Sequence, residues 1–203
     1  MKKYLIIVIM LMIFVTGCSF KDLFVKENKK EELLSGKINV QIDVKDYGII
    51  KLELDADTAP ITVTNFVNLV NDKFYDGLTF HRIINDFMIQ GGDPDHNGNG
   101  GSDKKIKGEF SSNGVKNDIS HVRGVISMAR SNDPNSASSQ FFIMHKDYTS
   151  LDGNYAAFGH VTEGIEVVDK IEEKIAPLAI DDNGTISFES QPVISSIRVI
   201  ENE

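Results

Sequence analysis

The strict alternation of apolar and polar residues that begins near position 38 constrains the fold of this chain most. Apolar side chains occupy every second position from Ile38 to Val44 and again from Ile50 to Leu54, with Tyr47-Gly48 between the two stretches. Side chains of a β-strand point alternately to opposite faces, so this pattern predicts two strands that are joined by a turn and buried on one face.

More short apolar segments follow, separated by clusters of Gly, Asn, Asp and Ser that are typical of turns. The further strands that they predict are residues 78–84, 124–129, 140–144, 156–161 and 193–200. Helical spacing of apolar residues appears from Pro60 to Val70 and again over 164–174. Many short strands without regular strand–helix alternation indicate a mainly β, closed or two-layered antiparallel fold rather than a parallel α/β sheet.

The size and charge of the chain narrow the classes of function. Its 203 residues, 41% hydrophobic and 25% charged, fit one globular domain with a sizeable core. With 21 Lys and Arg against 30 Asp and Glu the formal net charge is −9, so we expect no nucleic acid as a partner. Cys18 is the sole cysteine, which excludes an intramolecular disulfide and a multi-cysteine metal cluster.

The first 17 residues have the pattern of an export signal. Lys2 and Lys3 precede an apolar run from Tyr4 to Val15, which fits a secretory signal and is short for a membrane-spanning helix. The following Val-Thr-Gly-Cys18 sequence resembles the lipobox of bacterial lipoproteins, in which the signal is cleaved before the Cys and the Cys is then acylated. A spare, unmodified Cys after an ordinary cleavage site is the alternative.

This resemblance implies three segments along the chain. Residues 1–17 are the expected lipoprotein signal peptide, residues 18–36 the acylated Cys and a flexible tether, and residues 37–203 the folded domain. The mixed charges of Lys26 to Glu32 are typical of a solvated linker. Several fatty acyl chains such as palmitate on Cys18 hold a protein firmly on a bilayer, so we expect an extracytoplasmic protein anchored to a bacterial membrane.

The segment Phe80 to Asp93, FHRIINDFMIQGGD, is very similar to the signature of the cyclophilins, which are peptidyl-prolyl cis-trans isomerases. Further matching segments, in the order and approximate spacing of that family, are residues 96–101, 108–110, 127–130, 139–143 and 151–153. The resemblance extends from about Lys37 to Val199. It implies a closed eight-stranded antiparallel β-barrel capped by two α-helices, and an isomerase that needs no cofactor.

The resemblance also implies the residues of the site. The catalytic arginine of the family falls on Arg82, and we expect Phe87 and Gln90 beside it at the catalytic centre. The expected substrate-binding residues are Met88, Gly98, Ala129, Arg130, Ser131, Gln140, Phe142, Leu151 and Tyr155. Without the family pattern, an arginine in a strand is more often a surface ion-pair partner, and a cluster of Phe and Met is more often core.

These residue types suit the isomerisation of an X-Pro bond. Amide resonance sets a barrier of about 18–20 kcal/mol, and no covalent bond has to be broken. In the twisted amide the nitrogen regains a lone pair, to which the fixed N–H donors of Arg82 can donate. Phe87, Met88 and Phe142 offer an apolar surface that can hold the pyrrolidine ring while the other end rotates.

Three positions differ from many eukaryotic cyclophilins. Ser150 replaces Trp, Tyr155 replaces His and Arg130 replaces Asn; the Tyr and the Arg resemble bacterial members. Loss of the indole at the rim removes apolar area and a polar N–H group. We therefore expect activity to persist, and cyclosporin to bind more weakly than it binds to members with the Trp.

No metal ion is expected. The five histidines include no pair at helical i, i+4 spacing and no HExxH motif. Asp93 to Gly98 matches the start of an EF-hand loop, but the twelfth position is Lys104 instead of an acid, so we interpret the segment as a loop.

The expected partners are therefore proline-containing segments of exported or envelope proteins, together with the lipid bilayer through acylated Cys18. Two alternatives remain open at this point. One is a binding module or holdase whose groove recognises a proline segment without relying on turnover. The other is a structural lipoprotein with an inactive site, for which Ser150 and Tyr155 are the hints.

Overall fold

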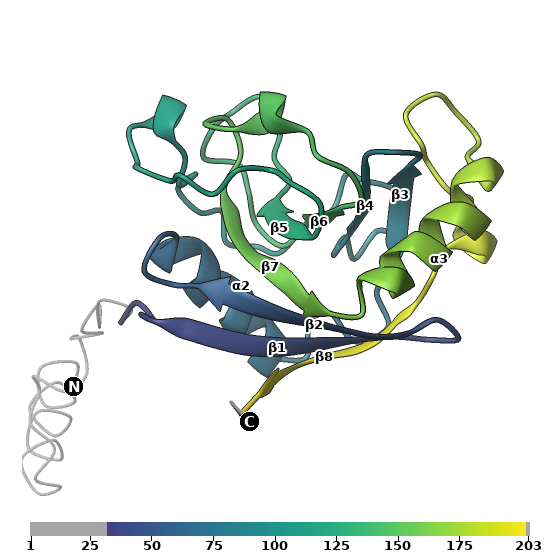
Figure 1. Cartoon of the computed structure of the whole chain (residues 1–203), viewed down its shortest axis with the longest axis horizontal. Coiled ribbons are helices and arrows are strands. Elements are labelled where there is room, and N and C mark those ends of the chain that lie inside the picture. Colours follow the sequence, from purple (N-terminus) through teal and green to yellow (C-terminus); the bar gives the residue numbers. More distant parts are fainter. Residues whose placement is uncertain (1–31, 202–203) are drawn as a thin grey trace, which may run out of the picture. The chain divides into compact units, whose positions relative to one another are not determined.

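The computed structural model describes residues 32–201, which form a mainly β architecture with eight strands and two α-helices (Figure 1). The strands are β1 (Lys37–Val44), β2 (Gly48–Asp55), β3 (Phe80–Ile84), β4 (Met88–Gly91), β5 (Val125–Met128), β6 (Phe141–Met144), β7 (Ala157–Glu163) and β8 (Ile194–Ile200). The helices are α2 (Pro60–Asn71) and α3 (Ile165–Ile175). Within this part of the chain, no helix combines the length and the apolar character that crossing a bilayer requires.

All eight strands belong to one antiparallel sheet with the order β3-β4-β6-β5-β7-β2-β1-β8. The predicted mainly β, antiparallel fold with two helices is confirmed. The pattern of the sequence missed β4, because Met88, Ile89 and Gly91 are all buried and the strand therefore shows no alternation.

The predicted closed barrel is wrong, because the sheet forms an open half-barrel. The outer edge of β3 is covered by residues 184–186 instead of pairing with β8. Ile83 N–H donates to the Gly184 carbonyl (2.8 Å), and Ile186 N–H donates to the His81 carbonyl (3.0 Å). In the described chain, the starts of β3 and β8 come together at an isolated bridge between Thr79 and Val193, which lie just before the two strands. The segment before β8 thus occupies the edge that closure would need.

The main core lies on the inner face of the sheet, against α2. Phe66 of this helix packs edge-on against Phe141 (ring centroids 5.5 Å apart) and close to Phe158 (5.3 Å). Glu109, which is 2% exposed, holds the start of α2 in place. Its carboxylate accepts hydrogen bonds from the backbone N–H groups of Ile61 and Thr62, which have no partner within the helix.

The compact unit begins at Leu33, so it includes the last residues of the stretch predicted as a tether. Leu34 packs against the core, and its N–H donates to Thr64 Oγ1 (2.9 Å). Gly36 N–H donates to Asp57 Oδ1 (2.7 Å), and the Gly36 carbonyl accepts from Ala56 N–H (2.9 Å). These bonds join residues 34–36 to the domain.

A β-bulge at His81 turns the next residue of β3 towards the outer face of the sheet. Phe80 pairs with Gly91 while Arg82 pairs with Gln90, so two steps along β3 correspond to one step along β4. Phe80 and Ile83 both lie in the core although they are three positions apart. Without the extra residue, Arg82 would share the inner face with Phe80.

His81 itself is buried at the bulge. Its side chain is 2% exposed, and neither ring nitrogen has a hydrogen-bond partner among the described residues. Burial, opposed by the nearby Asp93 carboxylate, lowers the pKa of His81 from 6.5 to about 4. Folding therefore favours the neutral imidazole.

We predict that the free energy of unfolding falls as the pH drops from about 6.5 to about 4, partly because of His81. In this window the unfolded chain binds a proton that the folded chain excludes, at roughly 1.4 kcal/mol per pH unit, or about 3 kcal/mol in all. Above pH 6.5 both states are neutral, and His81 contributes nothing. Urea unfolding across this range measures how steeply the free energy of unfolding depends on pH, which counts the protons that unfolding takes up. For His81→Gln this number should be smaller by nearly one proton. The exposed His160→Gln variant should keep the wild-type slope, and a wild-type slope in His81→Gln would contradict the prediction.

Candidate active site

Strand alternation in β6 builds a second apolar cluster on the outer face of the sheet. Phe141 and Ile143 point into the main core, whereas Phe142 and Met144 point outwards. Met88 of the neighbouring β4 joins them, because it pairs directly with Met144. Phe87, Leu151 and Tyr155 pack against this cluster.

A cavity of about 290 Å³ opens over this outer cluster. Ten of the residues expected at the site line it, namely Arg82, Phe87, Met88, Gln90, Gly98, Ala129, Arg130, Phe142, Leu151 and Tyr155. We call it the apolar cavity. Its floor is well buried, since Met88 is 1% exposed and Phe142 is 5% exposed. An apolar floor with a few polar groups at the rim is the usual composition of a small-ligand site.

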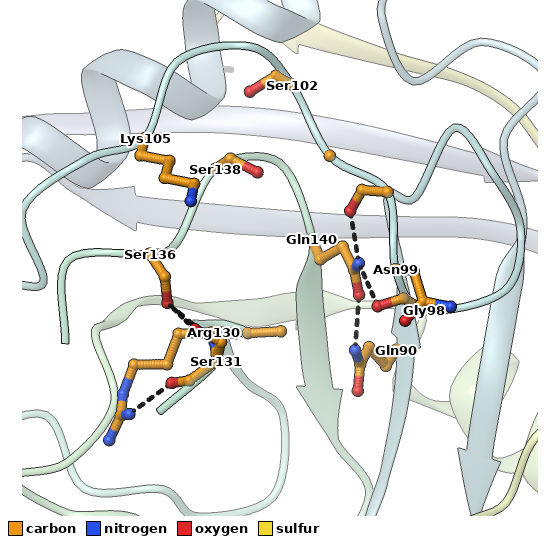
Figure 2. A pocket seen from close by; sticks show the side chains of 13 residues that line it. Gln90, Gly98, Asn99, Ser102, Lys105, Arg130, Ser131, Ser136, Ser138 and Gln140 are labelled. Atoms are coloured by element: carbon orange, nitrogen blue, oxygen red, sulfur yellow. Dashed lines mark hydrogen bonds between the residues drawn. The ribbon is translucent and has the colours of Figure 1, made fainter. Parts of the chain in front are cut away.

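Arg82 enters this cavity as the first member of a hydrogen-bonded chain. Its Nη1 donates to Gln90 Oε1 (2.9 Å), and Gln90 Nε2 donates to Gln140 Oε1 (2.8 Å). Gln140 Nε2 in turn donates to the carbonyls of Gly98 (3.0 Å) and Gly100 (2.8 Å), as Figure 2 shows. Each of the two glutamine amides donates through its nitrogen and accepts through its oxygen within this relay, so both amide groups have one favourable orientation.

The Arg82 guanidinium is also held from the opposite side. Its Nε donates to the Asn183 carbonyl (2.7 Å) in the segment that covers the edge of β3. Among residues 32–201 Arg82 makes no ion pair, although the Asp181 carboxylate attracts it at longer range. Burial lowers the pKa of Arg82 from its ordinary value, yet a guanidinium remains charged at neutral pH. The alternative of a surface ion-pair partner therefore does not describe this residue.

Tyr155 and Arg130 form one rim of the apolar cavity. The Tyr155 ring packs edge-on against Phe142 (5.9 Å), and the Arg130 guanidinium lies over the same Tyr155 ring (4.7 Å). Behind them, buried His121 stacks on Phe142 (6.1 Å) and is hydrogen-bonded by Asp152 and Ser127. Burial lowers the pKa of His121, while Asp152 opposes this shift. Arg130 and Tyr155, two of the three residues that differ from many eukaryotic cyclophilins, thus pack on each other.

A second, polar cavity of about 340 Å³ shares part of its lining with the first, and Figure 2 shows the side chains that surround it. Gln90, Gly98, Ala129 and Arg130 line both cavities. The remaining expected residues, Ser131 and Gln140, line the polar cavity alone. The two cavities together form a continuous surface along which an extended peptide could lie.

The loop between the cavities is organised by Asp93. This residue is fully buried, and its carboxylate accepts backbone N–H donors from Asp95 (2.8 Å), Asn97 (3.0 Å) and Gly98 (2.5 Å). These bonds hold the Gly98 carbonyl where Gln140 reaches it. The acid that resembles the first position of an EF-hand thus binds the backbone of its own loop.

The sequence missed three residues that line the apolar cavity, namely His81, Asn97 and Thr185. His81 and Asn97 lie inside recognised segments and could have been included by position. Thr185 lies far along the chain in a segment with no motif, so only the tertiary fold places it. Tyr148 was also missed, although its ring covers Phe87 (4.6 Å). Ser150 is exposed beside Leu151, and Cys18 lies outside the described residues.

This arrangement offers a rigid cation beside an apolar floor, with backbone and amide groups nearby. It provides hydrogen-bond donors and shape. Ser127, whose hydroxyl is hydrogen-bonded to His121, is fully buried and lines neither cavity, so no nucleophile paired with a base faces either of them. Chemistry that proceeds by binding a distorted neutral group fits it better than covalent chemistry does.

Comparison with known families agrees with this geometry. Residues 39–199 match the family described as cyclophilin type peptidyl-prolyl cis-trans isomerase/CLD. The chain is 43% identical over 135 residues to peptidyl-prolyl cis-trans isomerase A of Dickeya dadantii, covering 62% of this chain and 67% of the relative. It is 42% identical over 149 residues to the peptidyl-prolyl cis-trans isomerase of Helicobacter pylori, covering 72% of this chain and 87% of the relative.

Solved structures give the same result. A cyclophilin type isomerase of Cryptosporidium parvum superposes with a TM-score of 0.72 at 29% identity, covering 83% of this chain and 100% of that one. The same protein, solved in the presence of the dipeptide Ala-Pro, gives a TM-score of 0.70 at 30% identity, with coverage of 81% and 99%. The chain therefore belongs to the cyclophilin-type peptidyl-prolyl cis-trans isomerase family.

Proposed function

We propose that this protein isomerises X-Pro peptide bonds in exported or envelope proteins and so assists their folding. The observation that carries the proposal is the Arg82 guanidinium, held by Gln90 and by the Asn183 carbonyl beside an apolar cavity. The names of the relatives, which are peptidyl-prolyl cis-trans isomerases, support the reaction class. The client proteins follow from the export signal expected at the N-terminus.

In this mechanism the proline ring enters the apolar cavity against Met88 and Phe142, where burial fixes one end of the amide. As the C–N bond twists, its nitrogen becomes pyramidal and regains a lone pair. Arg82 Nη2 has no protein acceptor among residues 32–201, so it can donate to this nitrogen. The donor acts more strongly on the twisted amide than on the planar one, which lowers the barrier.

The rest of the relay fixes the position of that donor. Gln90 holds Nη1, and Gln140 holds Gln90, so the guanidinium cannot rotate away without breaking hydrogen bonds in a partly buried site. The peptide backbone flanking the proline would lie along Ala129 to Ser131 and over the polar cavity. The mechanism involves no covalent intermediate and calls for no cofactor.

We propose that the protein is lipid-anchored outside the cytoplasm through Cys18. The support is the apolar run from Tyr4 to Val15 followed by the lipobox-like residues before Cys18. Acyl chains on this residue would keep the isomerase at a bacterial membrane, where exported chains emerge.

We also propose that cyclosporin binds more weakly to this protein than to cyclophilins with Trp at the position of Ser150. The side chain of Ser150 is exposed and small, so the rim beside Leu151 offers less apolar area to a large ligand.

For the isomerase, we predict that the full chain in mild detergent accelerates cis-trans exchange of an Ala-Pro peptide, measured by NMR. Uncatalysed exchange takes tens of seconds or longer, which leaves a wide window. Arg82→Ala should lower kcat/KM about 10²- to 10³-fold, because it removes one transition-state donor.

Arg198→Ala is the matched control, since Arg198 lies on a strand, pairs with Asp76 and lines neither cavity. It should keep the wild-type rate. A folded wild-type chain that gives no acceleration would contradict the proposal and favour a binding module. Full activity in Arg82→Ala would contradict the role of the arginine.

For the anchor, we predict that the mature protein, isolated from bacterial membranes, begins at Cys18 and carries acyl chains. Mass spectrometry of the N-terminal peptide measures this directly, and Cys18→Ser should abolish both the cleavage before residue 18 and the acyl mass. An unmodified Cys18 in the membrane-derived protein would refute the anchor.

A further inference from the structure

A cluster of His145, Glu172 and Asp86 lies outside both cavities and has no part in the proposed reaction. Each of these residues offers a ligand atom, and the three atoms lie within 4.8 Å of one another. His145 follows β6, Asp86 lies in the turn between β3 and β4, and Glu172 lies on α3, which contacts β3 and β4 (Figure 1). Three separate segments therefore bring these side chains together.

The imidazole of His145 gives an independent indication that the cluster can bind a ligand. The residue is 8% exposed, and its Nδ1 has no hydrogen-bond partner among the described residues. This nitrogen faces Glu172 Oε1 at 3.8 Å, which is too far for a hydrogen bond. Two buried acceptors that face each other are unfavourable unless a proton or a metal ion lies between them.

The other ring nitrogen explains why Nδ1 carries the lone pair. His145 Nε2 lies 3.1 Å from Asp169 Oδ1, a close contact without hydrogen-bond geometry, and the charge of this carboxylate favours the proton on Nε2. Arg123 in turn pairs with Asp169 (2.7 Å) and fixes its position. A carboxylate that orients a histidine from behind is the arrangement that supports histidine ligands in metal sites.

The backbone also fixes the remaining ligands. Asp86 N–H donates to Glu172 Oε1 (3.0 Å), and His145 N–H donates to the Phe87 carbonyl (2.8 Å). The turn, the end of β6 and the helix are thereby tied together around the cluster. Asp86 is exposed, and its carboxylate pairs with exposed Lys146 (3.8 Å) and accepts from Asn85 Nδ2 (3.0 Å). Both contacts lie at the surface, so the carboxylate can exchange them for an inward position.

We propose that His145, Glu172 and Asp86 bind a divalent transition-metal ion of the Zn²⁺ class. Ligands of Zn²⁺ lie about 2.0–2.2 Å from the metal, so tetrahedral ligand atoms are roughly 3.4 Å apart. The 4.8 Å spread therefore closes with a small movement of Asp86. One imidazole and two carboxylates favour Zn²⁺ over Ca²⁺ and Mg²⁺, which prefer oxygen ligands alone.

Three protein ligands leave a coordination position for water. Among the residues of the cluster, none lines the apolar or the polar cavity. The ion would join the β3–β4 turn, which precedes Phe87 and Met88, to α3. Its role is structural, and it stands independently of the isomerase reaction.

The test is a calorimetric titration of the full chain, in mild detergent and freed of metal by a chelator, with ZnCl₂ at pH 7.5. We expect one Zn²⁺ per chain. The variants His145→Gln and Glu172→Gln should each lower the affinity at least tenfold. The melting temperature of the wild type should rise by about 5 °C at a free Zn²⁺ concentration roughly 100 times Kd, and that of His145→Gln should not.

Matched controls separate this site from adventitious binding. Glu173→Gln changes the exposed neighbour of Glu172, and His160→Gln changes an exposed histidine on β7. Cys18→Ser is a third control, which removes the thiol. Each of these three single variants should bind Zn²⁺ with an affinity within twofold of that of the wild type. Circular dichroism without metal checks that His145→Gln is folded, and anomalous scattering from a Zn²⁺-soaked crystal should place the ion between His145 and Glu172.

Any of three results would overturn the proposal. The first is no stoichiometric binding of Zn²⁺ by the wild type. The second is wild-type affinity in folded His145→Gln or Glu172→Gln. The third is an equal loss of affinity in a control variant, which would assign the binding to the surface or to the thiol.

Discussion

The bulge at His81 is the constraint on which the active site depends. It inserts one residue into β3 between Phe80, which packs in the core, and Arg82, which faces the apolar cavity. The partner strand accommodates it through Gly91, where an added Cβ would lie 2.8 Å from the Thr79 carbonyl oxygen. A glycine opposite the bulge therefore allows β3 and β4 to approach closely. This explains why His81 and Gly91 occur together within one short segment.

The inner face of the sheet forms the core, and its outer face forms the site. Alternation sends Phe141 inwards to α2 and Phe142 outwards to the cavity, so a single strand supplies both. Because β4 lies between β3 and β6, it places Gln90 between Arg82 and the Gln140 that precedes β6. The relay thus follows from strand order and register, and its donors are already positioned before a peptide arrives.

How much the sequence could predict depended on how far apart along the chain the interacting residues lie. Alternation around Ile38 to Val44 is local, so the first hairpin was predictable, and the motif around Arg82 carried most of the site. The open half-barrel was not predictable, because it depends on Gly184 pairing with Ile83 across the chain. Thr185 and the cluster around His145 were missed for the same reason: their partners are distant in sequence and share no spacing pattern.

We propose that Arg82 acts from a position that the relay fixes, and a double-mutant cycle on Gln90 and Gln140 tests this role most directly. The measurement is kcat/KM for Ala-Pro exchange in Gln90→Ala, Gln140→Ala and the double variant. If Gln140 acts through Gln90, we expect at least a tenfold loss in Gln90→Ala, a smaller loss in Gln140→Ala, and no further loss in the double variant. Losses that simply multiply in the double variant would show that the two glutamines act independently, and would contradict the account.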